Sequence, residues 1–385
     1  MSKFSLVIGG PFYRAMVRMR LVECPGPNIR GRLMVFFALT WIPMLTLSLA
    51  EGMAFGSKVK IPFLYDFWIY ARIFASLPLF LLAEIVVDPW IRRVISTFDS
   101  SGIVRESDLA AYRAALQKIE GWRDSSAVEF ALAILAFFPY FIFLDHEWVS
   151  STSSNWHGSM SASLTGAGWW FVFVTSPALR FLLIRWLWRY VLWSLLLRSI
   201  ARLNLNLTPA HPDLLGGLGF LLQAQQHFGI LCTAVGSIIA GQYANSITFF
   251  GAPIAGTQAP IAVFVVLSIL FVLGPLTVFS PRLVETRRSG VARYSQAGRR
   301  LTAAFDAKWA SGTDSARQSM LGSADPSSLI DFVSSYFVIR DMKLIPINKR
   351  VAINIALQAA APFAVLWFFA TPLDRIVKTL LQMVM

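Results

Sequence analysis

The chain has 385 residues, of which 56% are hydrophobic and only 14% charged, and its formal net charge is +13. Soluble proteins carry about 25% charged residues, and several nearly uncharged stretches here are long enough to cross a bilayer as helices, so composition excludes an ordinary soluble domain. The basic residues collect between the apolar stretches, as they do in cytoplasmic loops of membrane proteins, and we therefore expect the lipid bilayer as a partner and no nucleic acid.

The apolar stretches predict an all-α fold, a polytopic transmembrane helical bundle of about seven spans. Trp68 and Trp90 bracket the second stretch as interface anchors. Six spans followed by a re-entrant C-terminal hairpin is the alternative. The predicted spans are 33–50, 67–90, 126–144, 169–193, 226–248, 260–280 and 351–371.

The basic residues also predict which loops are cytoplasmic. Six of them precede the first span, and twelve, against six acidic residues, lie in 281–350. Residues 145–168 and 249–259 contain neither Lys nor Arg. Because basic loops are retained inside, we expect the N-terminal segment and 281–350 in the cytoplasm and the two neutral loops outside.

These assignments divide the chain into four parts. The loop 94–125 carries Leu109, Tyr112, Leu116 and Ile119 at helical spacing, which predicts a cytoplasmic helix with one apolar face. The parts are a cytoplasmic N-terminal segment 1–32, a six-span core 33–280 that includes the loop 94–125, a basic cytoplasmic helical segment 281–350, and 351–385 with the seventh span and an amphipathic C-terminal helix.

Charged residues within the spans are functional candidates, because a charge in the hydrocarbon is costly. Arg180 falls near the middle of the fourth span, and we predict that it pairs with Glu84 or Glu129. Such a pair either fixes helix register or forms an anion or gating site, and a proton relay through Glu84 is a third option. Arg72 is expected to pair with Asp66.

Two further arginines of the fourth span, Arg185 and Arg189, lie near the aromatic residues at its predicted inner edge. Long basic side chains near a helix end can extend toward the interface and keep their charge in water. For these two we therefore predict snorkelling.

The stretch "TPAHPDLLGGLGFL" at 208–221 follows the fourth span. It is not a phosphate loop, since that motif requires G-x-G-x-x-G after a strand, and His211 with Asp213 supplies too few ligands for a metal. In one interpretation, Pro209 and Pro212 end the fourth helix, Asp213 caps the next and the glycines allow close packing. In the other, this stretch is a hinge and a cytoplasmic mouth, with the candidates His211, Asp213, Gly216, Gly217 and Gly219.

The fifth span carries a polar stripe, because four-residue steps advance only about 40° around a helix. Small residues along such a stripe favour tight helix packing. A polar, small-residue stripe is also what a water-filled path requires. Its residues, which we name as pathway candidates, are Thr233, Ser237, Gly241 and Asn245.

The stretch 208–221, the segment "LGSADPSSLIDFVSSYFVIRDMKLIPINKR" and the ending "PLDRIVKTLL" together resemble a group of bacterial polytopic inner-membrane proteins that have no assigned activity. The resemblance covers roughly 198–385. It implies a multi-pass protein of the bacterial inner membrane and gives no catalytic residues to carry over.

Function is predicted only as a class. We expect a channel or transporter for an ion or small solute, acting as a homo-oligomer. One alternative is a signalling or assembly protein that binds a cytoplasmic partner through 281–350, and another is a membrane-embedded lipid enzyme. Cys24 and Cys232 have no metal-binding spacing, and no cofactor or metal site is predicted.

Overall fold

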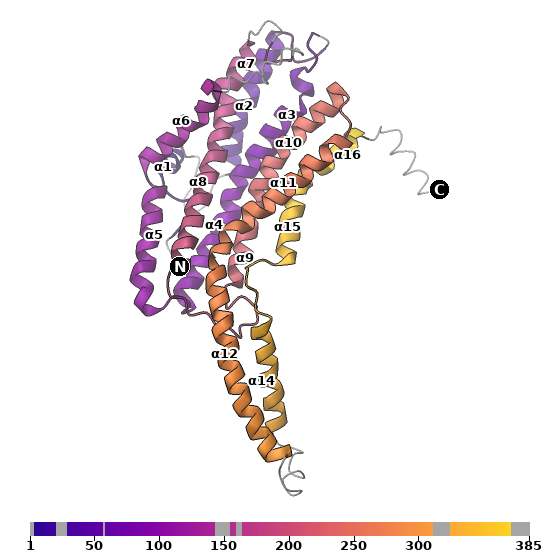
Figure 1. Cartoon of the computed structure of the whole chain (residues 1–385). Coiled ribbons are helices and arrows are strands. Elements are labelled where there is room, and N and C mark those ends of the chain that lie inside the picture. Colours follow the sequence, from indigo (N-terminus) through magenta and orange to yellow (C-terminus); the bar gives the residue numbers. More distant parts are fainter. Residues whose placement is uncertain are drawn as a thin grey trace, which may run out of the picture.

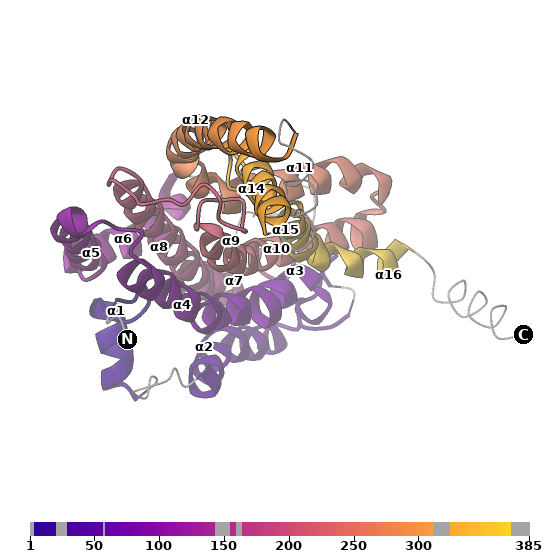
Figure 2. The same cartoon turned by 90° about the horizontal axis from the view of Figure 1, so that it is seen from below.

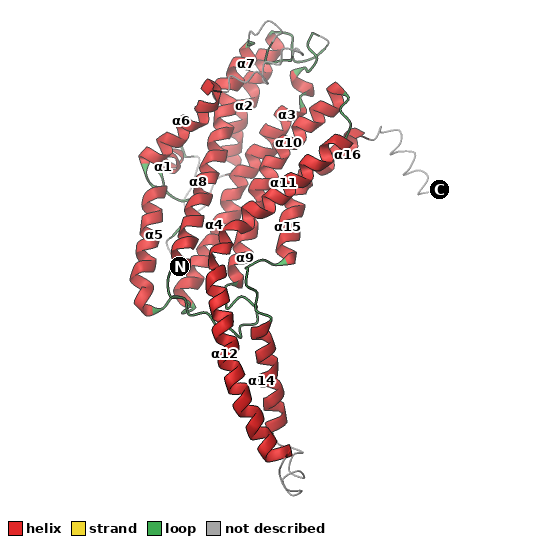
Figure 3. Ribbon diagram, in the orientation of Figure 1, coloured by secondary structure: helices red, strands yellow, loops and turns green. Residues whose placement is uncertain are grey.

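The computed structural model describes residues 4–20, 29–56, 58–142, 155–158, 164–310 and 324–370. It consists of a bundle of long helices and a two-helix hairpin, α12 (Ser280–Phe305) with α14 (Asp325–Arg340), that projects from one end of the bundle (Figure 1). The described residues form helices joined by loops (Figure 3). We call the end that carries the hairpin the hairpin end and the opposite one the far end.

Six helical stretches in the described residues are long and apolar enough to cross a membrane, which confirms an all-helical fold with several candidate spans. They are Ile29–Ala50, Phe67–Ser100, Gly166–Ala201, Gly219–Phe250, Ala255–Ala310 and Lys349–Phe368. A further span was predicted at 126–144, where the structure has the 17-residue helix α6 (Ser126–Ile142). The end of that span lies outside the described residues, and a count of seven stays a prediction.

Most of the long stretches are built from shorter elements that follow one another directly. The first stretch is the single helix α2 (Ile29–Ala50), the second joins α3 (Phe67–Tyr70), η2 (Ala71–Ser76) and α4 (Leu77–Ser100), and the third joins α7 (Gly166–Trp170), η4 (Phe171–Thr175) and α8 (Ser176–Ala201). The fourth joins α9 (Gly219–Gln225), η5 (Gln226–Phe228) and α10 (Gly229–Phe250), and the fifth joins α11 (Ala255–Leu273), η6 (Gly274–Phe279), α12 and η7 (Asp306–Ala310). The sixth joins α15 (Lys349–Ala360), η8 (Ala361–Val365) and α16 (Leu366–Ala370). The shorter helices are α1 Pro11–Arg18, η1 Phe63–Tyr65, η3 Glu106–Asp108 and α5 Leu109–Arg123.

Two of the long stretches contain a π-helical turn in the same context. The turns η2 and η4 each precede an α-helical segment with a proline in its first turn, Pro78 in α4 and Pro177 in α8. Proline has no N–H for the regular i to i−4 bond and its ring crowds the preceding turn. A single wider turn accommodates both effects without ending the helix.

The core lies between α4, α8 and α9 and contains fully buried aromatic side chains such as Phe80, Trp193 and Phe228. A polar chain crosses it: Trp193 Nε1 donates to Gln225 Oε1 at 2.8 Å, and Gln225 Nε2 donates to the Val272 carbonyl. Buried amides require such partners. This chain therefore fixes the register of α8, α9 and α11 together.

The helix α5 packs along this core with the apolar face that the sequence predicts. Tyr112 and Ile119 are buried, and Leu109 and Leu116 pack beside them. The predicted C-terminal helix after residue 370, by contrast, lies outside the described residues.

The hairpin is a continuation of the bundle, because α11, η6 and α12 run on without a break. Tyr294 of α12 stacks on Phe332 of α14, and Gly298 leaves room for that ring. At the tip, Asp325 accepts from Lys308 and from Trp309 Nε1. Seen along the bundle (Figure 2), α12 and α14 lie beside each other over α15 and α10.

Candidate functional site

The helix α10 is the element around which the candidate site is built. It packs against α3, η2, α4, α11 and α15, and Figure 2 shows it inside the bundle. Three cavities lie against α10 and its extension α9. We name them by position: the hairpin-end cavity, the mid-helix cavity and the far-end cavity.

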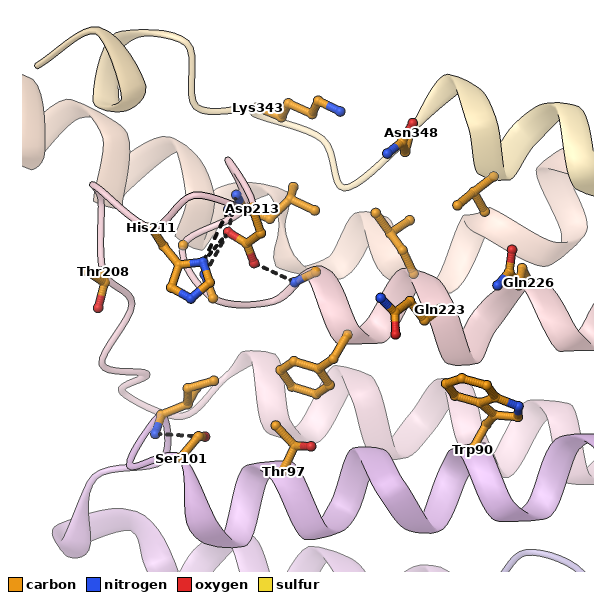
Figure 4. Close-up of a pocket in the computed structure, with 18 of the residues that line it drawn as sticks. Trp90, Thr97, Ser101, Thr208, His211, Asp213, Gln223, Gln226, Lys343 and Asn348 are labelled. Atoms are coloured by element: carbon orange, nitrogen blue, oxygen red, sulfur yellow. Dashed lines mark hydrogen bonds and ion pairs between the residues drawn. The ribbon is translucent and has the colours of Figure 1, made fainter. Parts of the chain in front are cut away.

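The hairpin-end cavity has a volume of about 900 Å³. Figure 4 shows it between α4, which carries Trp90 and Thr97, and the opposite wall with Asp213, Lys343 and Asn348. All five candidates of the stretch 208–221 line it. The charged and polar lining is Thr97, Ser101, Asn206, Thr208, His211, Asp213, Gln223, Gln226, Lys343, Asn348, Arg350 and Asn354.

The loop 208–219 is folded around the carboxylate of Asp213. Its Oδ1 accepts from the backbone N–H groups of Leu215 at 2.8 Å and Gly217 at 3.1 Å, and its Oδ2 accepts from Gly219 at 2.8 Å. Gly219 is the first residue of α9, so Asp213 caps that helix as the sequence predicts, although the two residues are six positions apart. The glycines allow the backbone to fold around Asp213, because Gly216 and Gly217 have φ of +66° and +98°, where a residue with a side chain is strained.

The ionisation of Asp213 follows from these contacts. Burial raises the pKa of the carboxyl, but hydrogen bonds from the Leu215, Gly219 and Gly217 N–H groups and from His211 outweigh burial and hold the pKa below its ordinary value of 3.8. His211 Nδ1 lies 2.8 Å from Asp213 Oδ1, while the ring stays partly exposed at the rim of the cavity. The loop therefore supplies its own anion for the N-terminus of α9.

The two prolines of this loop do not end the fourth helix, contrary to prediction. The helix α8 ends at Ala201, well before Pro209 and Pro212. Instead, Pro209 packs on α12, where a Cβ added at Gly290 would lie 2.7 Å from the Pro209 Cβ. The Leu214 carbonyl accepts from the Lys343 N–H at 2.9 Å. The loop is thus joined to the hairpin and to the segment that follows it.

That segment, 343–350, brings two cations to the cavity. Lys343 and Arg350 both line it, and within the described chain neither forms an ion pair with a carboxylate. The Asn348 side chain accepts from the Arg350 N–H at 3.0 Å and caps α15. Arg350 therefore lies in the capped first turn of α15, and Lys343 lies in the segment before that helix.

The far-end cavity has a volume of about 580 Å³, and Asp66, Trp68, Arg72, His157 and Asn245 are among its lining residues. The Arg72 guanidinium lies 3.5 Å from the centroid of the Trp68 ring. Burial lowers the pKa of His157 to about 4, more than Asp66 raises it, so this imidazole is neutral at pH 7. Arg72 and Asp66, which the sequence predicts to form a pair, both line this cavity. The Arg72 guanidinium lies over the Trp68 indole.

Asp66 itself is satisfied by neutral donors. Its Oδ1 accepts from the Trp68 and Ile69 N–H groups and from Asn245 Nδ2 at 2.7 Å, and its Oδ2 accepts from Trp156 Nε1 at 2.7 Å. Asp66 is the N-cap of α3, so this one carboxylate joins the start of α3, the end of α10 and residue 156.

Between these cavities, the polar stripe of α10 makes helix contacts. Thr233 Oγ1 donates to the Gln358 carbonyl of α15 at 2.9 Å, and a Cβ added at Gly241 would lie 2.6 Å from the Ala71 Cβ. Asn245 bonds to Asp66 and accepts from the Phe67 N–H. Ser237 donates to its own helix at the Thr233 carbonyl. These contacts favour the packing interpretation for Thr233, Gly241 and Asn245.

The stripe nevertheless borders open space. The mid-helix cavity, of about 360 Å³, is lined by Thr233, Ser237 and Gly241 together with mainly apolar residues of η2, η8 and α16. The contact of Thr233 with α15 lies on its hairpin-end side. The contact of Gly241 with Ala71 is part of its wall, and Phe67 and Ala244 continue that wall toward the far end. The three cavities share no lining residue.

A second polar centre is buried between α2, α4, α6 and α8. Glu84 lies within 2.5 Å of Arg32 Nη1, 3.0 Å of Arg189 Nη1 and 3.5 Å of Arg185 Nη1, and Arg185 also lies 3.2 Å from Glu129. The segment Phe4–Gly10 closes this centre from one side: Ser5 Oγ and the Leu6 and Val7 N–H groups donate to Asp88, and Arg189 donates to the Val7 carbonyl. We call the group Arg32, Glu84, Glu129, Arg185 and Arg189 the arginine centre.

Two predictions about these charges are wrong. The carboxylates of Glu84 and Glu129 bind Arg32, Arg185 and Arg189 instead of Arg180. Arg185 and Arg189 do not snorkel but are buried in the bundle. Their spacing of four residues places both on one face of α8. This spacing is visible in the sequence, but it does not name the partner that the two side chains share.

The chain was compared with protein-family models, with curated proteins and with solved structures, and it matches none of them. Among the residues that the structure describes, no group of three or more His, Cys, Asp or Glu side chains is arranged to hold a metal ion.

Proposed function

We propose that this protein is a membrane carrier for a small polar solute, which passes along α9 and α10. The observation that supports this most is that three cavities border one continuous helical stretch, one at the hairpin end, one midway and one toward the far end, the last two on opposite faces of α10. Helix contacts at Thr233 and Gly241 bound the middle one. A closed path with a site accessible at each end favours a carrier, which opens one side at a time, over an open channel.

The elements beside the path are suited to such movement. The contact at Gly241 joins α10 to η2, and π-helical turns are frequent at functional sites of helices. Gly229, Gly236 and Gly241 all approach neighbouring elements closely. A slide of α10 against η2 or α15 would open one contact while the other stays closed. We place the hairpin end in the cytoplasm of a bacterium, because the segment 281–350, which includes the hairpin, carries twelve basic residues against six acidic ones.

Sided labelling tests this function without knowledge of the solute. In a variant whose two cysteines are replaced by serine, single cysteines would be placed at Gln223, Ser237 and Gln242, one beside each cavity. An impermeant thiol reagent would be added to right-side-out and to inverted vesicles. The cysteine at Gln223 should react only from the cytoplasmic side and that at Gln242 only from outside. A carrier exposes the cysteine at Ser237 to both sides in turn, whereas a packing surface exposes it to neither.

Flux measurements complete the test. Osmotic swelling of proteoliposomes in isotonic solutions of glycine, glycerol or potassium phosphate would report passage of solute. Ser237→Leu should abolish any swelling that the unmodified protein supports, because the leucine fills the mid-helix cavity. Thr248→Leu is the matched control, since Thr248 lies on the same helix with its side chain exposed. Equal swelling with both variants would contradict the path.

The hairpin favours a second candidate function, the binding of an acidic partner protein. The face of α12 directed away from α14 exposes Arg288, Arg293, Arg299 and Arg300. On α14, Ile330, Val333 and Phe337 lie three and four residues apart and are exposed on the face directed away from α12. The hairpin therefore presents a basic surface on the outer side of α12 and an apolar surface on the outer side of α14, and an acidic partner with apolar side chains is complementary to these two surfaces.

Photo-crosslinking from position 330 in native membranes tests this candidate. A discrete crosslinked product should form, and Arg299→Glu with Arg300→Glu should remove it. Arg113→Glu with Lys118→Glu is the control, because those two side chains are equally exposed on α5. A product at twice the mass of the chain would assign the face to a second copy and overturn the acidic partner.

A further inference from the structure

We infer that the hairpin-end cavity binds a small hydroxylated organic anion, one that carries a carboxylate or a phosphate group. The inference deepens the proposed carrier by naming its class of solute. It rests on the juxtaposition of Lys343 and Arg350 with the amide side chains of α9 and α15 across one cavity.

The charge of the cavity is the first reason. Among its described lining residues, Asp213 is the one carboxylate. Its two oxygens are already occupied by three backbone N–H groups and by His211. Lys343 and Arg350 therefore face the cavity without a compensating carboxylate from the described chain. A cavity with uncompensated cations attracts anions and repels cations.

The hydrogen-bonding groups are the second reason. Trp90 Nε1 and the Gln223 amide make no hydrogen bond to the described protein, and both line the cavity beside α4 and α9 (Figure 4). Gln226 and Asn354 bond to each other at 3.4 Å, a long contact that a ligand can replace. Amides offer donors and acceptors together, which suits hydroxyl groups next to an anionic head.

The volume of the cavity indicates the class of ligand. A volume of about 900 Å³ far exceeds that of a bare halide or phosphate ion and falls in the range of pockets for small organic ligands. The cavity wall also includes Phe220 and Leu222 of α9, which can contact the carbon skeleton of such a ligand. The anionic head can belong to a soluble molecule or to a lipid headgroup, because Arg350 lies in the first turn of α15, which exposes Ile353 and Leu357 along its length.

Binding would be measured on the purified full chain in a neutral detergent, with glycerol 3-phosphate as the probe. Millimolar glycerol 3-phosphate should raise the unfolding temperature in a saturable manner, and neutral glycerol should not. Arg350→Gln should weaken binding about tenfold or more, because a hydrogen bond to a charged group contributes about 1.5–3 kcal/mol. Lys349→Gln is the matched control: this exposed neighbour is not part of the lining and should change the affinity less than about twofold.

Two results of the binding assay would overturn the inference. Equal weakening by Lys349→Gln would show non-specific attraction, and inorganic phosphate binding as tightly as glycerol 3-phosphate would remove the role of the hydroxyl groups. Nanodiscs with phosphatidylglycerol, compared with neutral nanodiscs, distinguish the lipid source: protection by that lipid alone supports a headgroup. Binding without flux in proteoliposomes would contradict the carrier and leave this site intact, whereas flux of glycine without anion binding would contradict this site alone.

Discussion

Glu84 lies within the second long helical stretch and Asp66 caps the start of that stretch; both carboxylates are buried, but the protein stabilises them in opposite ways. Glu84 is surrounded by three arginines, so its charge is matched by other buried charges. Asp66 is surrounded by two backbone N–H groups, an amide and an indole, so its charge is shared among neutral donors. The first arrangement depends on charge balance, and the second depends on geometry.

This difference predicts the largest effect for Glu84→Gln. The substitution keeps the shape of the side chain but leaves three buried guanidinium groups opposite Glu129 alone, and breaking a buried ion pair costs about 3–5 kcal/mol. We expect a large fall in the unfolding temperature in detergent. Glu285→Gln is the control, because Glu285 is exposed and pairs with Arg282 at 3.5 Å. Equal unfolding temperatures for both variants would mean that the arginine centre is not what stabilises the bundle.

Asp66→Asn should have an intermediate effect. The amide keeps one acceptor oxygen but directs an NH₂ group toward a donor, which leaves a buried group unsatisfied at about 1–3 kcal/mol. We expect a fall in unfolding temperature smaller than that of Glu84→Gln, measured in the same assay. Asp341→Asn, at an exposed aspartate, should change nothing. If Asp66→Asn proves worse than Glu84→Gln, the distinction between charge balance and geometry is wrong.

Asp213 is a third case, a partly buried carboxylate held by backbone N–H groups, and it predicts a pH dependence. Because its pKa in the folded protein lies below the ordinary 3.8, its contribution is complete above that value and is lost as the pH falls through the lower one. Asp213→Asn should lower stability by about 1–3 kcal/mol near neutral pH, because both oxygens accept from backbone N–H groups and the asparagine NH₂ would face one of these donors. The difference from the unmodified protein should be constant from about pH 8 to pH 5 and should shrink below about pH 4. A constant difference down to the lowest measurable pH would contradict the assignment.

Gly217→Ala should have the smallest effect, because only backbone conformation opposes it. An added Cβ would meet its nearest atoms at 3.8 and 3.9 Å, so there is room, but φ is +98°. We expect a loss of about 1–2 kcal/mol from that conformation. Gly256→Ala in α11 is the control: the space is open and φ is helical, so this change should be neutral or slightly stabilising. A neutral Gly217→Ala would show that the loop can rearrange around Asp213.

The helices were predictable because their apolar stretches exceed the length needed to cross a bilayer. The pairing of charges was not, and α8 shows why. The sequence places its inner end at the aromatic residues near 186–193, yet Gly166–Ala201 is one stretch of 36 residues, about 54 Å long. Arg185 and Arg189 therefore lie within the bundle, where Glu84 can reach them.

The loop 208–219 shows a different limit of prediction. Its capping aspartate was recognisable from residue type, as was the need for glycine. Three backbone N–H groups point at Asp213 because Leu214, Gly216 and Gly217 adopt left-handed conformations. The spacing of apolar residues in the sequence does not predict these conformations. The cations of the same cavity come from 343–350, and only the fold brings that segment beside α9.

The segment Phe4–Gly10 has a consequence for the order in which this protein assembles. Its acceptor Asp88 and its donor Arg189 are translated long after Ser5 and Val7. At about 5–20 residues per second, the segment waits roughly 10–40 s before α8 exists. During that interval Glu84 and Arg32 are already in the chain without Arg185 and Arg189. The segment Phe4–Gly10 thus closes the arginine centre only after Arg189 has been made, about halfway along the chain.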